Sequence, residues 1–247
     1  MKAKILILIP TLNEVHHILR LYKKILSLRI NFDFLFIDDG SSDGTWEIIK
    51  KIKKNNKNKV STIKRQKRNG LGKAHKDALF WAYKKKYTYL VTMDSDFAHD
   101  PKYIPKLIKY IRKADLVIGS RYLKQKSTPN WPWFRVFLSH NAHIVSSLLF
   151  NHKFDSTNAF RCYNLKKINK NFISYCKSND YDFFFTSLAI LNLSKYNILE
   201  FPMVIKARVK GNSKMLFKHI CKSIYMMFVL FLKITFKYRK NIESSYK

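Results

Sequence analysis

The chain has 247 residues, 47% of them hydrophobic, so it can bury the core of one main domain with an appendage, or of two small domains. Its 48 Lys and Arg residues against 16 Asp and Glu give a formal net charge of +32, which leaves both a nucleic acid and an anionic membrane face open as partners. The three cysteines lie far apart without C-x-x-C spacing, which suits a reducing cytosol and gives no support to a disulfide framework or a cysteine metal site.

The N-terminus begins with a short apolar segment that does not have the features of a secretory signal. Residues 5–9 are too few for the apolar region of a signal peptide, and Asn13 and Glu14 follow without a small-residue cleavage site. We therefore expect a buried first strand at 4–10. No uncharged apolar run reaches about 18 residues, so the sequence predicts no membrane span.

Strand and helix patterns alternate from residue 4 to residue 120. Apolar residues at helical spacing, such as Ile18, Leu21 and Ile25, mark the helices, and short apolar or β-branched runs mark the strands. The predicted strands are 4–10, 34–37, 60–63, 89–93 and 115–118, and the predicted helices cover about 18–28, 46–52, 73–85 and 102–112. This alternation predicts an α/β fold with a mostly parallel central sheet flanked by helices.

The second half of the chain is less regular. Two prolines mark a loop before the next helix, and a polar connection precedes a short strand and helix. The predicted segments are a loop at 123–133, a helix at 134–150, the connection at 155–161, a helix at 180–192 and a strand at 198–208. We expect one main domain over residues 1–213 and a separate C-terminal element over 214–247.

Two carboxylates, Asp94 and Asp96, follow the apolar strand at 89–93 with only Ser95 between them. Side chains at i and i+2 of an extended chain point the same way, so both can approach one hard cation at the carboxyl end of the strand. Open α/β sheets bind their ligands at that edge. The alternative reading is a strand end with two acids that cap the helix opened by Pro101.

Two glycine-containing loops have the appearance of ligand-binding motifs. The loop at 38–45 has the acidic spacing of a calcium-binding loop, but its twelfth position is Lys50 instead of Glu and it follows a strand, so we reject a calcium site. The loop at 69–74, NGLGKA, matches neither the P-loop nor the dinucleotide fingerprint. Its amides and Lys73 can meet a phosphate, or the loop can be a plain tight turn.

The segment 214–247 is basic and apolar. Lys218 and Lys222 recur at helical spacing with apolar residues on the other side, and residues 224–232 form an uncharged apolar run of nine. A helix of nine residues spans about 14 Å, roughly half of a bilayer's ~30 Å hydrocarbon core. Two readings remain open. The segment is either an amphipathic helix in the headgroup region of an anionic leaflet, or a helix packed on the protein body or on a partner's membrane helices.

Several motifs occur together in the order found in glycosyltransferase family 2. They are IPTLNE at 9–14, IDDGSSDGT at 37–45, NGLGKAH at 69–75, MDSDFAHDP at 93–101 and GSRY at 119–122. The chain resembles this family over most of residues 4–218. NWPWFR at 130–135 and R-x-x-G-x-S-K from Arg208 to Lys214 are similar to the branch of polyprenol-phosphate (dolichol-phosphate) mannosyltransferases.

The resemblance implies the nucleotide-sugar-binding GT-A fold, with the catalytic domain over 1–213 and a membrane-associating helix in 214–247. It also implies a role for each matching position. The implied nucleoside site is lined by Pro10, Leu12 and Glu14, and the base or ribose is held by Ile37 and Asp39. The implied diphosphate site contains Asp94, Ser95 and Asp96, of which Asp94 and Asp96 bind Mg²⁺ or Mn²⁺, and the donor is also contacted by Arg121, Arg208 and Lys214. The implied acceptor phosphate site contains Arg121, Arg135 and Ser139. Among these, Asp96, Arg121 and Arg135 are the implied catalytic residues.

The sequence departs from the family pattern at three places. Ala98 stands where relatives often carry a polar residue that helps bind the metal, so the resemblance implies a site that rests on Asp96, donor phosphates and water. Asn158-Ala159 replaces a glycine-bearing turn on the acceptor side. Tyr181-Asp182 replaces a Glu-rich helix start, and no role is assigned there.

The chemistry that the resemblance implies needs no general base. A phosphate monoester has its second pKa near 6, so it is mostly a dianionic nucleophile at neutral pH. Arg121 and Arg135 can bind it in bidentate fashion, while a divalent cation with Arg208 and Lys214 neutralises the leaving diphosphate. We therefore expect a single displacement with inversion that moves mannose from GDP-mannose to a polyprenyl phosphate.

A polyprenyl chain resides in the bilayer, so the resemblance implies a peripheral enzyme at the cytoplasmic face of an anionic membrane, with a small membrane-protein partner left open. The alternatives within the family are a transferase that uses UDP-glucose or another nucleotide sugar for surface glycans, and a catalytically idle member. The alternative of another class is a basic nucleic-acid-binding protein. No RNP-like, KH-like or zinc-finger pattern supports that alternative, so we expect no nucleic-acid partner.

Overall fold

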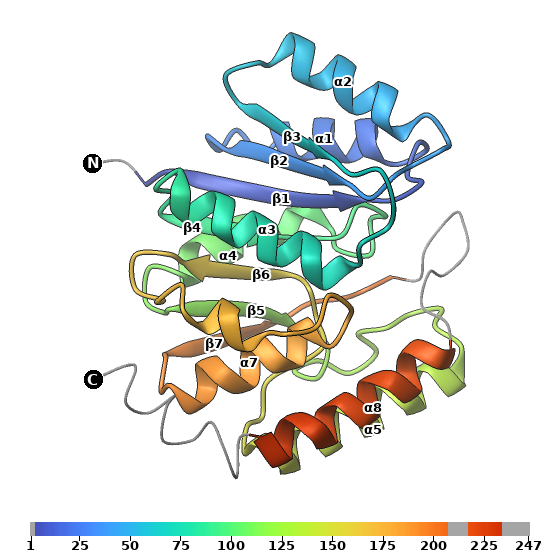
Figure 1. Ribbon diagram of the computed structural model, residues 1–247, viewed down its shortest axis with the longest axis vertical. Coiled ribbons are helices and arrows are strands. Elements are labelled where there is room, and N and C mark those ends of the chain that lie inside the picture. Colours follow the sequence, from blue (N-terminus) through green and yellow to red (C-terminus); the bar gives the residue numbers. More distant parts are fainter. Residues whose placement is uncertain (1–2, 207–216, 234–247) are drawn as a thin grey trace.

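The computed structural model describes residues 3–206 and 217–233, apart from the side chains of 217–224. In this part of the chain a seven-stranded sheet has the order β3-β2-β1-β4-β6-β5-β7 (Figure 1). The strands are β1 Ile5–Thr11, β2 Asp33–Asp38, β3 Val60–Lys64, β4 Tyr89–Thr92, β5 Leu116–Ser120, β6 Arg161–Asn164 and β7 Ile198–Pro202. The sheet confirms the predicted α/β architecture.

The strands are mostly parallel, with one exception. β1 pairs in parallel with both β2 and β4, and β5 with β7, whereas β6 is antiparallel to both β4 and β5. The segment between β5 and β6 leaves and re-enters the sheet at the same edge, because Arg161 at the start of β6 pairs with Thr92 and Ile118 near the ends of β4 and β5. The alternation up to residue 120 did not predict this reversal.

Helices cover both faces of the sheet (Figure 1). They are α1 Ile18–Leu26, α2 Thr45–Asn55, α3 Leu71–Lys84, α4 Ile104–Tyr110, α5 Trp133–Phe150, α6 Phe172–Tyr175, α7 Phe183–Leu193 and α8 Phe217–Lys233, with the 3₁₀ turn η1 Pro101–Tyr103. β1 shows how the core divides. Ile5, Ile7 and Ile9 pack with α1, α2 and α4, while Leu6 and Leu8 face the other way and pack with α3 and α7.

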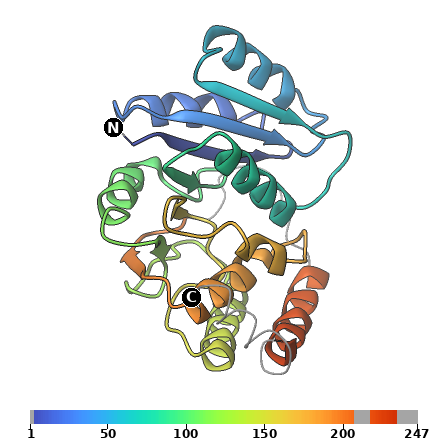
Figure 2. The same ribbon diagram turned by 60° about the vertical axis from the view of Figure 1, so that its left-hand side comes forward.

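A third, smaller core joins α5, α7 and α8. Phe150 of α5 and Phe185 and Ala189 of α7 enclose Met227 and Leu230 of α8. In Figures 1 and 2 alike, α5 and α8 lie at the opposite end of the molecule from α2. Within residues 3–206 and 217–233, no helix has both the length and the apolar character needed to cross a membrane.

Two predicted elements differ in extent from the observed ones. The helix expected at 102–112 begins as η1, and its regular part, α4, is only seven residues long, because Pro105 has no N–H to donate to the carbonyl of Pro101. The strand expected at 198–208 ends at Pro202, which also lacks the N–H needed for pairing. Residues 207–208 of the predicted strand lie outside the described residues.

Candidate active site

Asp94 and Asp96 follow β4 at the carboxyl edge of the sheet. The backbone N–H of Asp94 donates to Nδ1 of the buried His99 at 2.9 Å, and Oδ1 of Asp96 accepts from the backbone N–H of Ala98 at 3.0 Å. The side chain of Asp94 is 33% exposed. Asp100, whose carboxylate accepts from the N–H of Lys102, is the residue that caps the following turn. The capping role at this turn is therefore filled by a third acid, Asp100.

The donor set suits a hard divalent cation. Carboxylate oxygens at a partly exposed loop are the ligands that Mg²⁺ and Mn²⁺ accept. In the part of the chain that the structure describes, no group of three or more His, Cys, Asp or Glu side chains could hold a metal ion. A cation bound here therefore needs further oxygen ligands from a phosphate or from water.

The loop after β1 is fixed to the loop after β2. The N–H of Asn13 donates to Oγ of Ser41 and the N–H of Ser42 donates back to Oδ1 of Asn13, both at 2.9 Å. The N–H of Glu14 donates to Oγ1 of Thr45 at 2.7 Å. These bonds hold the two expected nucleoside loops together as one rigid rim.

The strand residues expected at the nucleoside are neighbours in the sheet. Pro10 and Ile37 are paired in register between β1 and β2. The side chain of Ile37 is fully buried in the core beside α3, and Glu14 is only 3% exposed. Ile37 therefore presents its backbone, and not its side chain, to this rim.

Asp39 is held from two sides. Nη1 of Arg65 donates to its Oδ1 at 2.5 Å, and the N–H of Gly70 donates to its Oδ2 at 3.1 Å. The same guanidinium donates through Nη2 to Oδ2 of Asp77 at 2.5 Å, and Lys73 pairs with the other oxygen of Asp77. Sequence reasoning missed Arg65, because nothing distinguished it from the other basic residues of 64–68.

These contacts decide between the two readings of the loop at 69–74. The ammonium of Lys73 pairs with Asp77, and a Cβ on Gly72 would lie 2.4 Å from the carbonyl oxygen of Asp180. Gly70 has a φ of +94°, which an L side chain rarely adopts. The glycines are therefore explained by the close approach of residues 179–180, as expected for a tight turn.

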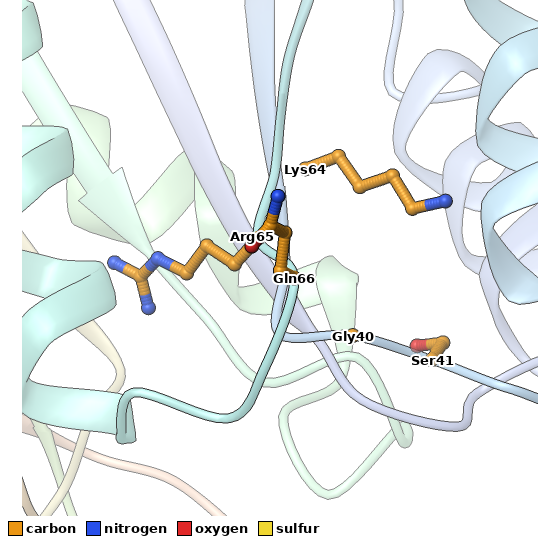
Figure 3. A pocket seen from close by; sticks show the side chains of 5 residues that line it. All are labelled: Gly40, Ser41, Lys64, Arg65 and Gln66. Carbon is orange, nitrogen blue, oxygen red and sulfur yellow. The ribbon is translucent and has the colours of Figure 1, made fainter.

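A pocket of about 380 Å³ lies beyond the carboxyl ends of β2 and β3. It is lined by Gly40, Ser41, Lys64, Arg65 and Gln66. Figure 3 shows the side chains of Lys64 and Arg65 pointing in opposite directions from the end of β3. The pocket therefore adjoins the Arg65 clamp on Asp39.

Arg121, directly after β5, makes a buried bidentate ion pair with Asp155. Its Nε donates to Oδ2 at 2.8 Å and its Nη2 to Oδ1 at 2.6 Å, while its backbone N–H also donates to Oδ2 at 3.1 Å. Burial raises the pKa of Asp155, but the guanidinium outweighs this effect and holds that pKa below its usual value. Asp155 was not predicted, although it is the first acid after Asp115 in the sequence.

The structure brings the other two expected acceptor residues close to Arg121. Nη1 of Arg121 donates to Oγ of Ser139 on α5 at 3.3 Å. The guanidinium of Arg135 lies 3.8 Å from the ring centre of Trp131, and that of Arg121 lies 5.9 Å from the same ring. Arg121, Arg135 and Ser139 therefore form one cluster around the start of α5.

Glu200 on β7 contacts this cluster through Asp155. Its Oε1 accepts from the backbone N–H of Asp155 at 2.5 Å. Burial, together with the nearby Asp155 carboxylate, raises its pKa to about 7.

The departure at Asn158-Ala159 joins the acceptor side to the strand that carries the paired acids. The carbonyl of Ala159 accepts from Oγ1 of Thr92 at 2.6 Å, and the side chain of Asn158 donates to the carbonyl of Gly119. The ends of β4 and β5 are therefore bridged without a glycine. Arg208 and Lys214 lie outside the described residues.

The fold is that of the GT-A nucleotide-sugar transferases. A crystal structure of glucosyl-3-phosphoglycerate synthase from Mycobacterium tuberculosis, in complex with Mn²⁺, UDP and phosphoglyceric acid, matches with a TM-score of 0.65 at 16% identity. The match covers 93% of this chain and 78% of that chain. At this level of identity the likeness concerns the fold alone.

The sequence comparisons identify the family. The model of glycosyl transferase family 2 matches residues 6–176. The polyprenol monophosphomannose synthase of Mycolicibacterium smegmatis is 31% identical over 224 residues, which cover 89% of this chain and 84% of the relative. The undecaprenyl-phosphate mannosyltransferase of Micrococcus luteus is 29% identical over 216 residues, 86% and 87% of the two chains. This chain belongs to glycosyl transferase family 2 and is a glycosyltransferase.

Proposed function

We propose that this glycosyltransferase moves mannose from GDP-mannose to a polyprenyl phosphate, with inversion at the sugar. The observation that carries the substrate class is the likeness, over nearly the whole chain, to relatives named for mannose and for polyprenol or undecaprenyl phosphate. The acid pair after β4 and the arginine cluster after β5 support it, because one suits a nucleotide diphosphate with its cation and the other suits a phosphate acceptor.

On the donor side, Asp94 and Asp96 would hold Mg²⁺ or Mn²⁺ together with phosphate oxygens and water. Such a cation, when bound, neutralises charge on the leaving diphosphate. The loops of Pro10, Leu12 and Glu14 and of Asp39 line the nucleoside, and the Arg65 clamp fixes the carboxylate of Asp39. Arg208 and Lys214 contribute positive charge to the donor, as the family motif implies.

On the acceptor side, the protein supplies charge and orientation. The phosphate of the lipid is already mostly dianionic at neutral pH, so no side chain has to remove a proton. Asp155 pairs with Nε and Nη2 of Arg121, so this guanidinium cannot also hold a phosphate in the expected bidentate fashion. Its Nη1, directed at Ser139, is the group that would contact the acceptor phosphate. Arg135 adds a second cation above Trp131. Asp155 is therefore a positioning residue for the acceptor phosphate.

The acceptor's hydrocarbon chain lies in the bilayer, which places the proposed reaction at a membrane. The body of the protein would work as a peripheral enzyme at the cytoplasmic face, attracted to anionic lipid by its net charge of +32. A small membrane-protein partner is compatible with this arrangement.

The test is transfer by the purified protein with Mg²⁺ or Mn²⁺, labelled GDP-mannose or UDP-glucose, and a short-chain polyprenyl phosphate. We expect a lipid-extractable sugar phosphate from GDP-mannose. Asp96→Asn should lower turnover at least about a hundredfold, because it removes a charged ligand of the cation. Asp100→Asn is the matched control, since Asn caps a helix as well as Asp.

Two outcomes would overturn parts of this proposal. Transfer from UDP-glucose alone would replace the donor. Full turnover by Asp96→Asn, with Asp100→Asn equally active, would remove the metal site from these acids.

A further inference from the structure

Large exposed hydrophobic side chains are concentrated on α5. Trp133 is 80% exposed, Leu148 78% and Phe137 61%. The helix adds further partly exposed apolar residues, namely Phe134, Val136, Ile144 and Val145. Contiguous apolar surface of this kind marks a binding site for a partner or for a membrane.

The exposed residues form one stripe along the helix. At 100° per residue, Trp133, Phe137, Ile144 and Leu148 fall within an arc of about 60°. The opposite face of α5 contacts the body of the protein, where Ser139 bonds Arg121, Ser146 bonds His152 at 3.2 Å, and Phe150 is buried. The packing of α5 on the protein body therefore does not require the apolar side chains of the outer stripe.

α8 extends the same kind of surface. Its residues Met227 and Leu230 are buried against α5 and α7, whereas Tyr225 is 66% and Phe228 56% exposed. Tyr225, Phe228 and Leu232 follow the i, i+3, i+7 spacing of one helix face. α5 and α8 are in contact and lie side by side at one end of the molecule (Figures 1 and 2). We call the two exposed stripes together the α5–α8 face.

The sequence around this face contains no acidic residue. Neither residues 116–154 nor residues 201–242 include an Asp or Glu, while Lys124, Arg135 and Lys153 lie within the first stretch. An apolar stripe whose neighbours along the chain are basic is complementary to an anionic lipid surface.

We propose that the α5–α8 face docks the protein on an anionic bilayer, with the α5 stripe, including Trp133 at its start, inserted into the headgroup region. This inference rests on the proposed function, which requires access to a lipid phosphate. The sequence placed the membrane contact in the C-terminal segment alone, whereas this proposal assigns the main contact to α5. Arg135 and Ser139 lie on the opposite face of the same helix, about 10 Å across it, so docking through α5 would hold the acceptor cluster on the water side of the inserted stripe, next to the lipid headgroups.

The test measures binding of the full chain to vesicles of phosphatidylcholine with phosphatidylglycerol, without polyprenyl phosphate or donor. The triple variant Trp133→Ser, Phe137→Ser, Leu148→Ser should bind at least about tenfold more weakly, because three large side chains no longer insert. The control is Leu26→Ser with Phe80→Ser, which changes exposed side chains on α1 and α3 and should bind like the unaltered protein. Far-UV circular dichroism and thermal unfolding check that each variant folds.

Three results would overturn the inference. One is equal vesicle binding by the folded triple variant and the unaltered protein. Another is equal binding to vesicles with and without the anionic lipid. The third is an unaltered protein that does not bind vesicles but forms a dimer that the triple variant cannot form, which would make the face a contact between copies.

A transfer assay with a water-soluble acceptor separates this inference from the proposed function. The triple variant should keep its transfer rate there while it loses vesicle binding. Vesicle binding through α5 without any transfer would contradict the proposed reaction and leave the docking face standing.

Discussion

Arg65 connects three segments on the donor side through two carboxylates. It follows β3, and its guanidinium bonds Asp39 after β2 and Asp77 on α3. Its own side chain is only 7% exposed, so the charges interact with little screening by water. Removing one charged side chain from such a buried set leaves the charges of the other side chains unpaired.

We predict that Arg65→Met lowers the free energy of unfolding by about 3 kcal/mol, because it leaves Asp39 without its ion-pair partner. Arg68→Met is the matched control. That side chain is exposed, so its replacement should change stability by less than about 0.5 kcal/mol. Urea denaturation of both variants is the measurement, and equal effects would show that the clamp contributes nothing.

Glu200 makes stability depend on pH in a direction opposite to that of most carboxylates. Burial raises its pKa to about 7 from 4.5, so the native state holds a proton that the unfolded state has lost. Its contribution to stability is therefore complete below about pH 4.5 and is lost as the pH rises through about 7. The carboxylate form is the unfavourable one in the folded protein.

Glu200→Gln keeps an oxygen that accepts from the N–H of Asp155 but cannot ionise. Relative to the unaltered protein, the variant should gain up to about 3 kcal/mol in unfolding free energy between pH 4 and pH 8. Denaturant titrations at several pH values measure this difference. Parallel pH dependences in the two proteins would mean that Glu200 titrates normally.

Motifs in the sequence identified Asp39 and Arg121, but not the residues that pair with them. Arg65 is 26 residues from Asp39, and Asp155 is 34 residues from Arg121. These pairs form only because β2 lies beside β3 and because the chain returns after α5. Nothing in the local pattern of either residue reports such a contact.

At the scale of elements, α3 is positioned by the absence of a side chain at its second residue. Gly72 lies against residues 179–180 and Phe183 at the start of α7, and a Cβ there would approach the Cβ of Phe183 to 2.8 Å. Helix α3 can therefore approach α7 only because this position is glycine.

Gly72→Ala separates packing from helix propensity. Propensity alone would stabilise α3 by about 1 kcal/mol. Because the new methyl group overlaps the backbone of Asp180, we predict instead a net loss of about 1–3 kcal/mol, measured by urea denaturation. A stabilised variant would show that the two helices can separate at little cost.

The elements also show where sequence patterns stop being informative. β1 to β5 follow the alternation of strands and helices, and their order in the chain sets their parallel direction. β6, with the sequence RCYN, is only four residues long and has no alternating pattern. Its direction is set by α5, which returns the chain to the edge it left, and this depends on the packing of α5 against α7 and α8.

The molecule as a whole has two functional ends of different character. The proposed nucleoside-binding loops after β1 and β2 are bonded to each other and carry paired charges, whereas the other end carries the proposed acceptor cluster beside an exposed apolar helix. The sequence predicted a lipid acceptor from its motifs and placed the membrane contact in the C-terminal segment. The exposed stripe of α5 was not predicted, because a half-apolar helix has the same pattern whether its apolar side faces a core or a bilayer.

The anomeric configuration of the lipid product tests the central claim most directly. A single displacement by the lipid phosphate on the α-linked mannose of GDP-mannose should give a β-linked mannosyl phosphate, which nuclear magnetic resonance of the extracted product can establish. An α-linked product would require a second displacement at the sugar, and would contradict an account in which an already ionised phosphate, held by Arg121 and Arg135, attacks the donor directly.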